Sequence, residues 1–407
     1  MNIISDELCK PRYPGRDLPV LRQVPHSAGT KMKQDIRNES NALRSAFGAH
    51  FLMRDAVRLL SPWFREHARS LPWREDPTVY HTWVSEIMLQ QTRVETVIPY
   101  YLRFIDALPD TKALSACPED RLMKLWEGLG YYSRVRNLQR AAIVIEEKYG
   151  GVIPEEREAL LSLPGIGAYT AGAILSIALE KPEPVVDGNV LRVVSRILGD
   201  RSDIALPETR DAYSDLLLKV IRETAGEISP RVFNQSLMEL GALVCIPNGA
   251  PRCEDCPVSS LCISHLKDLT DEIPYRSPKK PRNIRQITVL MITDGQHFYI
   301  TKNKGKGLLS RLYGYPFLEG KRSAEEAAAY VRTLGFIPGV PVRLKPGKHI
   351  FTHVEWHMDA WLIRAEDADP DLHRALIPAG PEELKERYAL PSAFQKWEKE
   401  QKELLEK

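Results

Sequence analysis

One short stretch constrains this chain more than any other, the run LPGIGAYTA at residues 163–171. Its Pro164, Gly165 and Gly167 predict a tight turn between two apolar helical segments. Because glycine has no Cβ, a ligand can approach the backbone N–H groups of such a turn closely. At a helix N-terminus these groups also carry partial positive charge, which suits a phosphate. The run therefore predicts either a phosphate-binding hairpin or an ordinary connection between two helices.

An acidic residue follows this turn. Asp187 ends an apolar run and precedes a predicted helix from Val190 to Leu198, and Asn189 lies between them. Asp and Asn are preferred helix N-caps, so both residues have an ordinary structural interpretation. If the helix packs against the hairpin, Asp187 would also lie beside the bound phosphate.

A second acidic residue lies at the margin of buried surface. Glu86 belongs to a predicted helix over 80–91 and stands at the edge of its apolar face. A carboxyl group in that place is usually a rim charge or the partner of an arginine, and a general acid is the alternative. A proline-bounded connection with Arg74 precedes the helix, and Gln91 and Thr92 end it.

The segment 128–137 interrupts the helical pattern with two glycines, two tyrosines and two arginines. It combines close backbone approach, flat side chains for stacking and cationic partners for phosphates. The alternative is a loop whose tyrosines pack on a neighbouring helix. Either interpretation fits the segment taken alone.

Changes in periodicity divide the chain into parts. Residues 1–48 lack periodicity and are expected to form a flexible extension. From 49 to 267 the hydrophobic spacing is helical and predicts an all-helical domain. Prolines and basic residues mark 268–285 as a linker, and alternating hydrophobicity then predicts a smaller α+β domain over 286–400, with a tail at 401–407.

Two local patterns stand out in the second domain. The run SAEE at 323–326 predicts a capping box that begins a helix. The segment 349–364 is predicted as a strand that includes Phe351, Thr352 and His353.

Four cysteines lie within eighteen residues in the spacing C-x7-C-x2-C-x5-C: Cys245, Cys253, Cys256 and Cys262. Prolines between them force a compact loop. Such clustering predicts a metal site in a reducing compartment rather than a disulfide framework. The spacing alone allows tetrahedral zinc or a [4Fe–4S] cluster.

Composition excludes several other classes of protein. The formal net charge is only +2, so a surface for nucleic acid must be local. No apolar run approaches the roughly 18 residues needed to span a bilayer. The N-terminus has no apolar segment before a cleavage site, so no secretion signal is predicted and we expect a cytoplasmic protein without a membrane partner.

Five motifs in order make the chain similar to adenine DNA glycosylases of the MutY type: WVSEIMLQQT at 83–92, GLGYYSRVRNL at 128–138, LPGIGAYTA at 163–171, VDGNV at 186–190 and the four cysteines. The resemblance covers about residues 51–394. It implies an all-α helix-hairpin-helix glycosylase domain with a four-cysteine iron–sulfur loop (245–262), followed by a smaller α+β Nudix-like domain.

The resemblance also implies a reaction. The family removes adenine mispaired with 8-oxoguanine from double-stranded DNA, and carries a structural [4Fe–4S] cluster. By the resemblance, Glu86 would protonate adenine N7 while Asp187 stabilises the oxocarbenium-like sugar. Tyr169 and Asn189 would orient the two carboxyl groups. A single lesion needs one copy of the enzyme, so we expect a monomer associated with the nucleoid.

The resemblance implies further DNA contacts. The base must be flipped from the duplex, and Gln91 and Tyr131 are candidates to fill the vacated stack. The hairpin would hold a phosphate, and a monovalent cation could bridge the two. The residues implied in DNA contact are Arg74, Gln91, Thr92, Tyr131, Gly165, Gly167, Phe351, Thr352 and His353, the last three at the oxidised guanine.

The chain departs from the family pattern in two places. Seven residues separate Cys245 from Cys253 where the family usually has six, so a local bulge is expected in the loop. Thr352 stands in a triplet that is Phe-Ser-His in the family, which keeps the hydroxyl and adds a methyl group.

Three other functions remain as alternatives. A bifunctional endonuclease III-like glycosylase with lyase activity needs an amine nucleophile, and Tyr169 stands where relatives of that kind carry a lysine. A Nudix pyrophosphatase needs an Arg-Glu-x-x-Glu-Glu pattern, which the stretch around Glu325 and Glu326 lacks. A non-enzymatic DNA-binding protein would explain the hairpin but not both acids.

Overall fold

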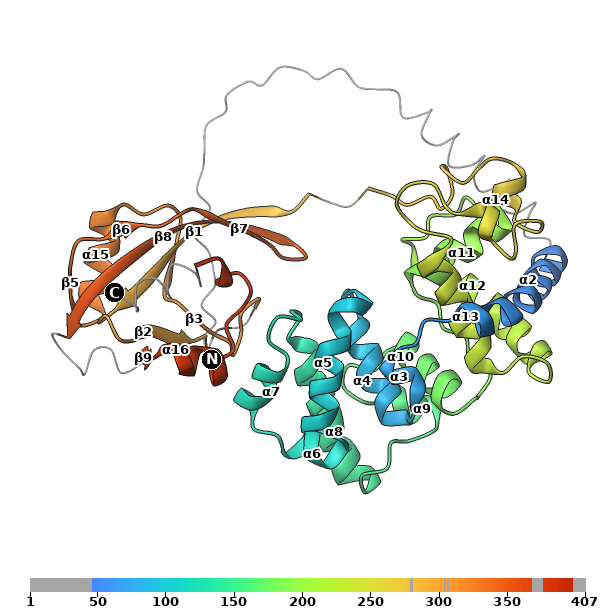
Figure 1. Cartoon of the computed structure of the whole chain (residues 1–407), viewed down its shortest axis with the longest axis horizontal. Helices are drawn as coiled ribbons and strands as arrows, with labels where there is room; N and C mark the ends of the chain where they lie inside the picture. The colour runs from blue at the N-terminus through green and yellow to red at the C-terminus, as the bar shows by residue number, and fades with distance from the viewer. Residues whose placement is uncertain (1–45, 279–280, 304, 306, 368–375, 398–407) are drawn as a thin grey trace, which may run out of the picture.

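A computed structural model describes residues 46–278, 281–303, 305, 307–367 and 376–397. These residues form a helical region followed by a mixed α+β domain (Figure 1), which confirms the predicted fold class. Of the predicted extension 1–48, only 46–48 are described, and they belong to the first helix rather than to an extension. The predicted tail 401–407 and the end of the second domain beyond 397 lie outside the described residues.

The helical region contains, in chain order, α2 (Ala46–His67), α3 (Pro72–Glu75), α4 (Val79–Leu89), α5 (Val94–Ala107), α6 (Thr111–Ala116), α7 (Glu119–Leu125), α8 (Ser133–Tyr149), α9 (Arg157–Leu161), α10 (Ala168–Ala173), the π-helix η1 (Ile174–Ala178), α11 (Gly188–Leu198), α12 (Pro207–Thr224), α13 (Pro230–Leu243), the 3₁₀ turn η2 (Cys253–Asp255) and α14 (Ile263–Leu266). No strand interrupts this region within the described ranges, as predicted.

Two separate cores divide the helical region into lobes. The first lobe packs α3 to α10 around large buried side chains such as Trp83, Phe104 and Trp126. The second lobe packs α11 to α13 around Phe233, and it includes α2 through Leu60 and its neighbours. The described part of the chain therefore begins in the second lobe, crosses to the first and returns, so that α2 lies beside α12 and α13 (Figure 1).

The second domain contains β1 (Asn283–Thr293), β2 (Phe298–Lys302), β3 (Tyr313–Gly314), β4 (Phe317–Glu319), α15 (Ala324–Thr333), β5 (Phe336–Pro338), β6 (Val342–Arg343), β7 (Gly347–Ile350), β8 (Val354–Asp367), β9 (Leu376–Ala379), α16 (Pro381–Glu386) and the 3₁₀ turn η3 (Gln395–Trp397). The strand order is β3-β2-β1-β8-β5, and β1 runs parallel to β8 and antiparallel to β2.

The sheet of the second domain is covered on both faces. One face packs around Trp356, Phe394 and Trp397, and the other packs against α15 through Val331. Ser323 accepts a hydrogen bond from Glu326 N and completes a capping box, as predicted. Because β1 lies in the middle, seven consecutive residues of it are buried, and its alternation is only partial.

Two predicted boundaries are wrong. The predicted strand over 349–364 is two strands, and residues 351–353 form the turn between β7 and β8. Phe351 lies in the turn but packs on Trp356, with ring centroids 5.1 Å apart. An apolar residue in a turn looks like part of a strand when only the hydrophobic pattern is considered. The predicted linker 268–285 also overlaps β1, which begins at Asn283.

None of the helices in the part of the chain that the structure describes is both long enough and apolar enough to cross a membrane.

Candidate active site

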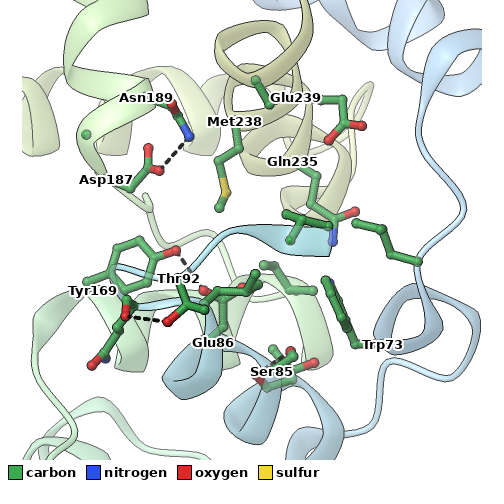
Figure 2. A pocket seen from close by; sticks show the side chains of 18 of the residues that line it. Trp73, Ser85, Glu86, Thr92, Tyr169, Asp187, Asn189, Gln235, Met238 and Glu239 are labelled. Carbon is green, nitrogen blue, oxygen red and sulfur yellow. Dashed lines mark hydrogen bonds between the residues drawn. The ribbon is translucent and has the colours of Figure 1, made fainter. Parts of the chain in front are cut away.

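A cavity of about 540 Å³ lies between the two lobes of the helical region. Residues of α3, α4 and the start of α10 line it from the first lobe, and α11 and α13 line it from the second. Figure 2 shows Glu86 and Tyr169 on one side of this space and Asp187 and Asn189 on the other. The two acids singled out in the sequence, about a hundred residues apart, therefore line one cavity.

Glu86 lies on the buried face of α4 and is only 5% exposed. Tyr169 OH donates a hydrogen bond to its Oε2 at 2.7 Å. Burial raises the pKa of Glu86 to about 7, and the nearby charge of Asp187 adds to this, while Tyr169 and Arg74 act in the opposite direction. The Glu86 carboxyl can therefore hold a proton at neutral pH and release it to a ligand in the cavity.

Asp187 is the N-cap of α11. Its Oδ1 accepts a hydrogen bond from Val190 N at 2.7 Å, and its Oδ2 accepts one from Asn189 Nδ2 at 3.1 Å. Burial raises the pKa of Asp187, and these hydrogen bonds, together with the charge of Arg192, oppose the increase. The capping interpretation and the active-site interpretation thus apply to the same carboxyl group.

The surroundings of the two acids decide where a shared proton lies. Asp187 has hydrogen-bond donors for both of its oxygens, whereas Tyr169 is the side-chain donor to Glu86. Each donor favours the ionised form of its acceptor. Since two like charges in one cavity disfavour double ionisation, the proton is favoured on Glu86 and the charge on Asp187.

A third acid in the cavity was missed by sequence reasoning. Glu239, on α13, is 1% exposed and pairs with Arg69 Nε at 2.8 Å and Arg74 Nη2 at 2.7 Å. Burial works to raise the pKa of Glu239, but the hydrogen bonds from the two arginines prevail and hold it at about 2. Its sequence signal is a charge between Leu237 and Leu240 on an apolar helix, an unusual place unless the charge is paired.

This ion pair also places Arg74. Its guanidinium is bound to Glu239 and to the carbonyl of Arg69, and its side chain is 16% exposed. Arg74 therefore lies in the wall of the cavity, and in the described contacts its guanidinium donates to groups of the protein itself.

Gln91 and Tyr131 share an unusual backbone geometry. Both have positive φ, 59° and 48°, although neither is glycine. Both side chains are exposed, Tyr131 by 44%. Such strained, exposed residues occur preferentially at functional sites. Thr92, beside Gln91, lines the cavity.

Arg134 holds these two strained turns in place. Its Nη1 donates to the carbonyl of Gln90, and its Nη2 donates to Thr92 Oγ1 at 3.3 Å and to the carbonyls of Leu129 and Gly130 at 3.2 and 3.3 Å. Burial lowers the pKa of Arg134 to about 10. Of the two interpretations left open for 128–137, the contacts of Arg134 favour the packed loop, because its guanidinium satisfies buried carbonyls.

The hairpin of the 163–171 run is exposed at both glycines. Gly165 has φ of 80°, and a Cβ there would lie 2.7 Å from Asn137 Cβ, so glycine is required on both grounds. Gly167 is the N-cap of α10 and has open space around it. The hairpin therefore presents a compact backbone without side-chain obstruction.

The turn 351–353 lies at the tip of the β7–β8 hairpin in the second domain. Thr352 and His353 are exposed, and Phe351 is half-buried. Thr352 Oγ1 donates a hydrogen bond to Tyr131 OH at 3.3 Å. The two domains therefore meet at residues that the sequence assigns to DNA contact.

The four clustered cysteines line one small cavity in the second lobe. None of the five cysteines in the described ranges forms a disulfide, and Arg196 Nη1 lies 3.3 Å from Cys245 Sγ. Among the described side chains, no three His, Cys, Asp or Glu converge closely enough to hold a metal ion. The donor set itself, four thiols around one space, is of the kind that zinc and iron–sulfur clusters use.

Arg192 connects the cysteine loop to the carboxylate of the cavity. Its Nε donates to the carbonyl of Cys245 at 2.8 Å, and its Nη2 donates to Asn189 Oδ1 at 2.9 Å. The same Asn189 donates to Asp187. The position of α11 and of its N-cap thus depends on the loop that carries the thiols.

Comparison with known families identifies both parts of the chain. Residues 84–220 match the family model described as "HhH-GPD superfamily base excision DNA repair protein", and residues 288–399 match "NUDIX domain".

Several curated relatives carry the name adenine DNA glycosylase. The protein of Buchnera aphidicola subsp. Acyrthosiphon pisum is 33% identical over 75% of this chain and 86% of its own length. The rat protein is 43% identical over 52% of this chain and 42% of its own length. The human protein is 40% identical over 55% of this chain and 43% of its own length. Among solved structures, "Structure of a thermostable thymine-DNA glycosylase" has a TM-score of 0.47 and 28% identity, over 53% of this chain and 97% of that one.

Proposed function

The chain belongs to the adenine DNA glycosylase family, and from this premise we propose that it excises adenine mispaired with 8-oxoguanine or guanine in double-stranded DNA and leaves the strand intact. It is a DNA glycosylase of base-excision repair, an enzyme that hydrolyses an N-glycosyl bond. The observation that carries the proposal is the convergence of Glu86 and Asp187 on one cavity.

The roles of the two acids follow from their surroundings. Glu86, with a pKa of about 7, donates its proton to N7 of the flipped adenine and makes the base a better leaving group. Asp187, held by Val190 N and Asn189 Nδ2, faces the positive charge that develops on the sugar and stabilises it. A water then completes the hydrolysis.

The remaining cavity wall suits a purine. Glu239 offers an ionised acceptor for an exocyclic amine, and Arg69 and Arg74 keep it ionised. Trp73 adds an aromatic surface for the flat base (Figure 2). An adenine amine can donate to such an acceptor, whereas a carbonyl oxygen at the same position would be repelled.

The basic residues of this cavity fit a glycosylase without lyase activity. The basic side chains among the described lining residues are Arg69, Arg74 and Arg210, whose guanidinium groups stay protonated and do not act as amine nucleophiles. Tyr169 stands at the hairpin position where relatives with lyase activity carry a lysine, and its hydroxyl donates a hydrogen bond to Glu86. These features support hydrolysis without a Schiff base, and disfavour the lyase alternative.

We assign a structural [4Fe–4S] cluster to Cys245, Cys253, Cys256 and Cys262, on the basis of the four-thiol donor set and the family. A cluster there would join α13 to the loop that Arg192 connects to Asn189. Purified protein should contain iron and absorb visible light, and removing the iron should lower the melting temperature. Stoichiometric zinc without iron would contradict the assignment.

The second domain is proposed to read the base opposite the adenine. Support comes from the exposed turn of Thr352 and His353 beside Tyr131, together with the half-buried ring of Phe351. The acids of α15 are engaged locally, since Glu326 completes a capping box and pairs with Arg322 at 3.1 Å. This placement favours recognition over pyrophosphate hydrolysis in this domain.

The test measures single-turnover rates of adenine release from duplexes that carry A opposite 8-oxoguanine, G or T. Strand cleavage in the product is compared with and without alkaline treatment, because alkali breaks the strand at an abasic site. We expect adenine release with an intact abasic strand, and the fastest release opposite 8-oxoguanine. Glu86→Gln serves as the matched inactive control, because it keeps the size of the side chain and replaces the acidic carboxyl group with an amide that cannot protonate the base.

The result can go against the proposal in two ways. Strand scission without alkali in protein that is otherwise pure would favour the lyase alternative. Release of adenine that is equally fast from every mispair and from A:T would remove the assigned specificity.

A further inference from the structure

Several polar contacts join the second domain to the helical region: Glu119 of α7 pairs with Arg311 at 3.2 Å, and Arg136 of α8 donates to the carbonyl of Ser310 at 2.7 Å. Asp120 of α7 makes two such contacts. Asp120 Oδ1 accepts a hydrogen bond from Lys302 Nζ at 2.6 Å, and its Oδ2 accepts one from Tyr313 OH at 2.9 Å. Lys302 also lies over the Tyr313 ring, 5.0 Å from its centroid. Both oxygens of one carboxylate are therefore used by the other domain.

Two more residues extend this contact, Lys124 on α7 and Glu127 in the turn after it. Lys124 Nζ donates to two carbonyls of the segment 384–388, at 3.0 and 3.2 Å. Glu127 accepts a hydrogen bond from Leu390 N at 2.6 Å and also pairs with Lys124. Asp120 and Lys124 lie four apart on one face of α7, and together with Glu127 we call them the α7 clasp.

Apolar contacts accompany the clasp. Leu312 and Ala389, both from the second domain, are buried within the core cluster of the first lobe, with exposures of 2% and 1%. Tyr313 and Tyr388, both of the second domain, pack edge to face with centroids 4.7 Å apart and so join the two segments of that domain that bind α7. The interface therefore combines directional polar contacts with buried apolar surface, which fixes orientation as well as proximity.

The sheet connects the clasp to the turn 351–353. Lys302 is on β2 and Tyr313 is on β3, and the order β3-β2-β1-β8 leads across the sheet to the strand that follows the turn. β1 and β8 are paired in register from Asn283 and Val354 to Thr293 and Arg364. A hydrogen-bonded sheet moves as a unit, so the clasp at one edge sets where the turn lies.

We propose that the α7 clasp holds the turn 351–353 in register with Tyr131, and that Asp120 is thereby a positioning residue for discrimination between 8-oxoguanine and guanine opposite the adenine. This inference rests on the proposed function, in which the second domain reads that base. Asp120 acts through β2, β1 and β8 rather than by touching the DNA.

The test compares Asp120→Asn and Tyr313→Phe with the wild type, as full chains, on A:8-oxoG and A:G duplexes. Each substitution should lower the ratio of the two single-turnover rates by roughly three- to tenfold, the size expected for the net contribution of one hydrogen bond. The rate on A:G should stay unchanged, because Glu86 and Asp187 are not disturbed. Asp120→Lys combined with Lys302→Asp should restore much of the ratio.

A matched control comes from an exposed ion pair far from the interface. Glu227, in the segment between α12 and α13, pairs with Arg58 Nη2 of α2 at 2.7 Å, so Glu227→Gln removes an ion pair and should leave the ratio at the wild-type value. Melting temperatures of all variants show whether any change in the ratio reflects loss of folding.

Two failures are distinguishable. If the wild type shows no preference for 8-oxoguanine, or if removing residues 283–407 leaves the preference intact, the proposed function of the second domain fails. If that removal abolishes the preference while Asp120→Asn and Tyr313→Phe retain it in full, the second domain reads the base without the clasp, and this inference is overturned.

Discussion

At the scale of single residues, the two carboxyl groups of the cavity differ in the hydrogen-bond donors that surround them. Glu86 is buried in α4 and receives the hydroxyl of Tyr169, whereas Asp187 receives a backbone and a side-chain amide. Burial raises the pKa of both acids, but the donors favour the charge on Asp187. In the proposed reaction, Glu86 is thus kept ready to donate a proton, and Asp187 to face a cation.

The pH dependence of excision should report Glu86. The acid must be protonated to act, and its pKa of about 7 lies above the ordinary value of 4.5. The single-turnover rate should therefore fall about tenfold per pH unit above neutral, as Glu86 ionises. A rate that stays level up to pH 9 would exclude Glu86 as the proton donor.

Tyr169→Phe should move this alkaline limb to higher pH. The Tyr169 hydrogen bond stabilises the ionised carboxylate, so removing it raises the pKa of Glu86 further. The pH–rate profile measures the shift, and a limb that moves to lower pH would show that the hydroxyl favours the neutral acid instead.

Asp187→Asn should separate the two roles of that residue. Asparagine is as good an N-cap as aspartate, so the melting temperature should change little. The negative charge is lost, and excision should fall by about 10²- to 10³-fold, the usual cost of removing one electrostatic stabiliser. Asp187→Ala, which also removes the cap, should cost about 1 kcal/mol of stability in denaturant unfolding. Substantial excision by the Asn variant would remove the assigned role.

At the scale of elements, buried arginines fix the loops that surround the cavity. Arg134 joins the turn after α4 to the loop before α8, and Arg192 joins α11 to the cysteine loop. A planar guanidinium presents five donors in fixed directions, so one side chain can satisfy carbonyls of two segments. Loops that carry strained residues such as Gln91 and Tyr131 need such support.

Arg134→Met should test this support. The substitution leaves several buried carbonyls without a donor and should lower the free energy of unfolding by about 3 kcal/mol. It should also weaken the fluorescence change of 2-aminopurine placed opposite the lesion, because both insertion candidates lose their position. Arg140→Met, on the exposed face of α8, is the matched control and should leave both readouts unchanged.

At the scale of the whole molecule, two lobes form the chemical site and a second domain approaches it from outside. The lobes are joined by the segment between α2 and α3 and by the segment between η1 and α11, and their facing surfaces enclose the cavity. The second domain rests on α7 and extends the turn 351–353 to Tyr131 (Figure 1). Under the proposed division of roles, catalysis and recognition should therefore be separable by truncation.

A chain ending at residue 282 should keep adenine excision on A:G and lose most of its preference for 8-oxoguanine. The boundary follows from β1, which begins at Asn283. Removal exposes the first-lobe surface that Leu312 and Ala389 cover, so some loss of stability is expected as well. Rates on both duplexes, measured below the melting temperature, separate the two effects.

Much of this architecture could be predicted from local pattern. Helical spacing, the capping box at Ser323 and the glycines of the hairpin each report the geometry of a few neighbouring residues, and these predictions are confirmed in the described ranges. The motifs around Glu86 and Asp187 identified the family, because their order along the chain is itself information.

The sequence alone thus determined the helical nature of the first domain, the mixed nature of the second and the family to which the chain belongs. Only the tertiary structure decided which side chains share a cavity, since periodicity marks a buried face but not the face that packs against it. For that reason Glu239 was missed, the role of Arg134 was left open, and the turn at Phe351 was taken for a strand. Contacts between residues far apart in the chain depend on how whole elements pack, and no local pattern records that.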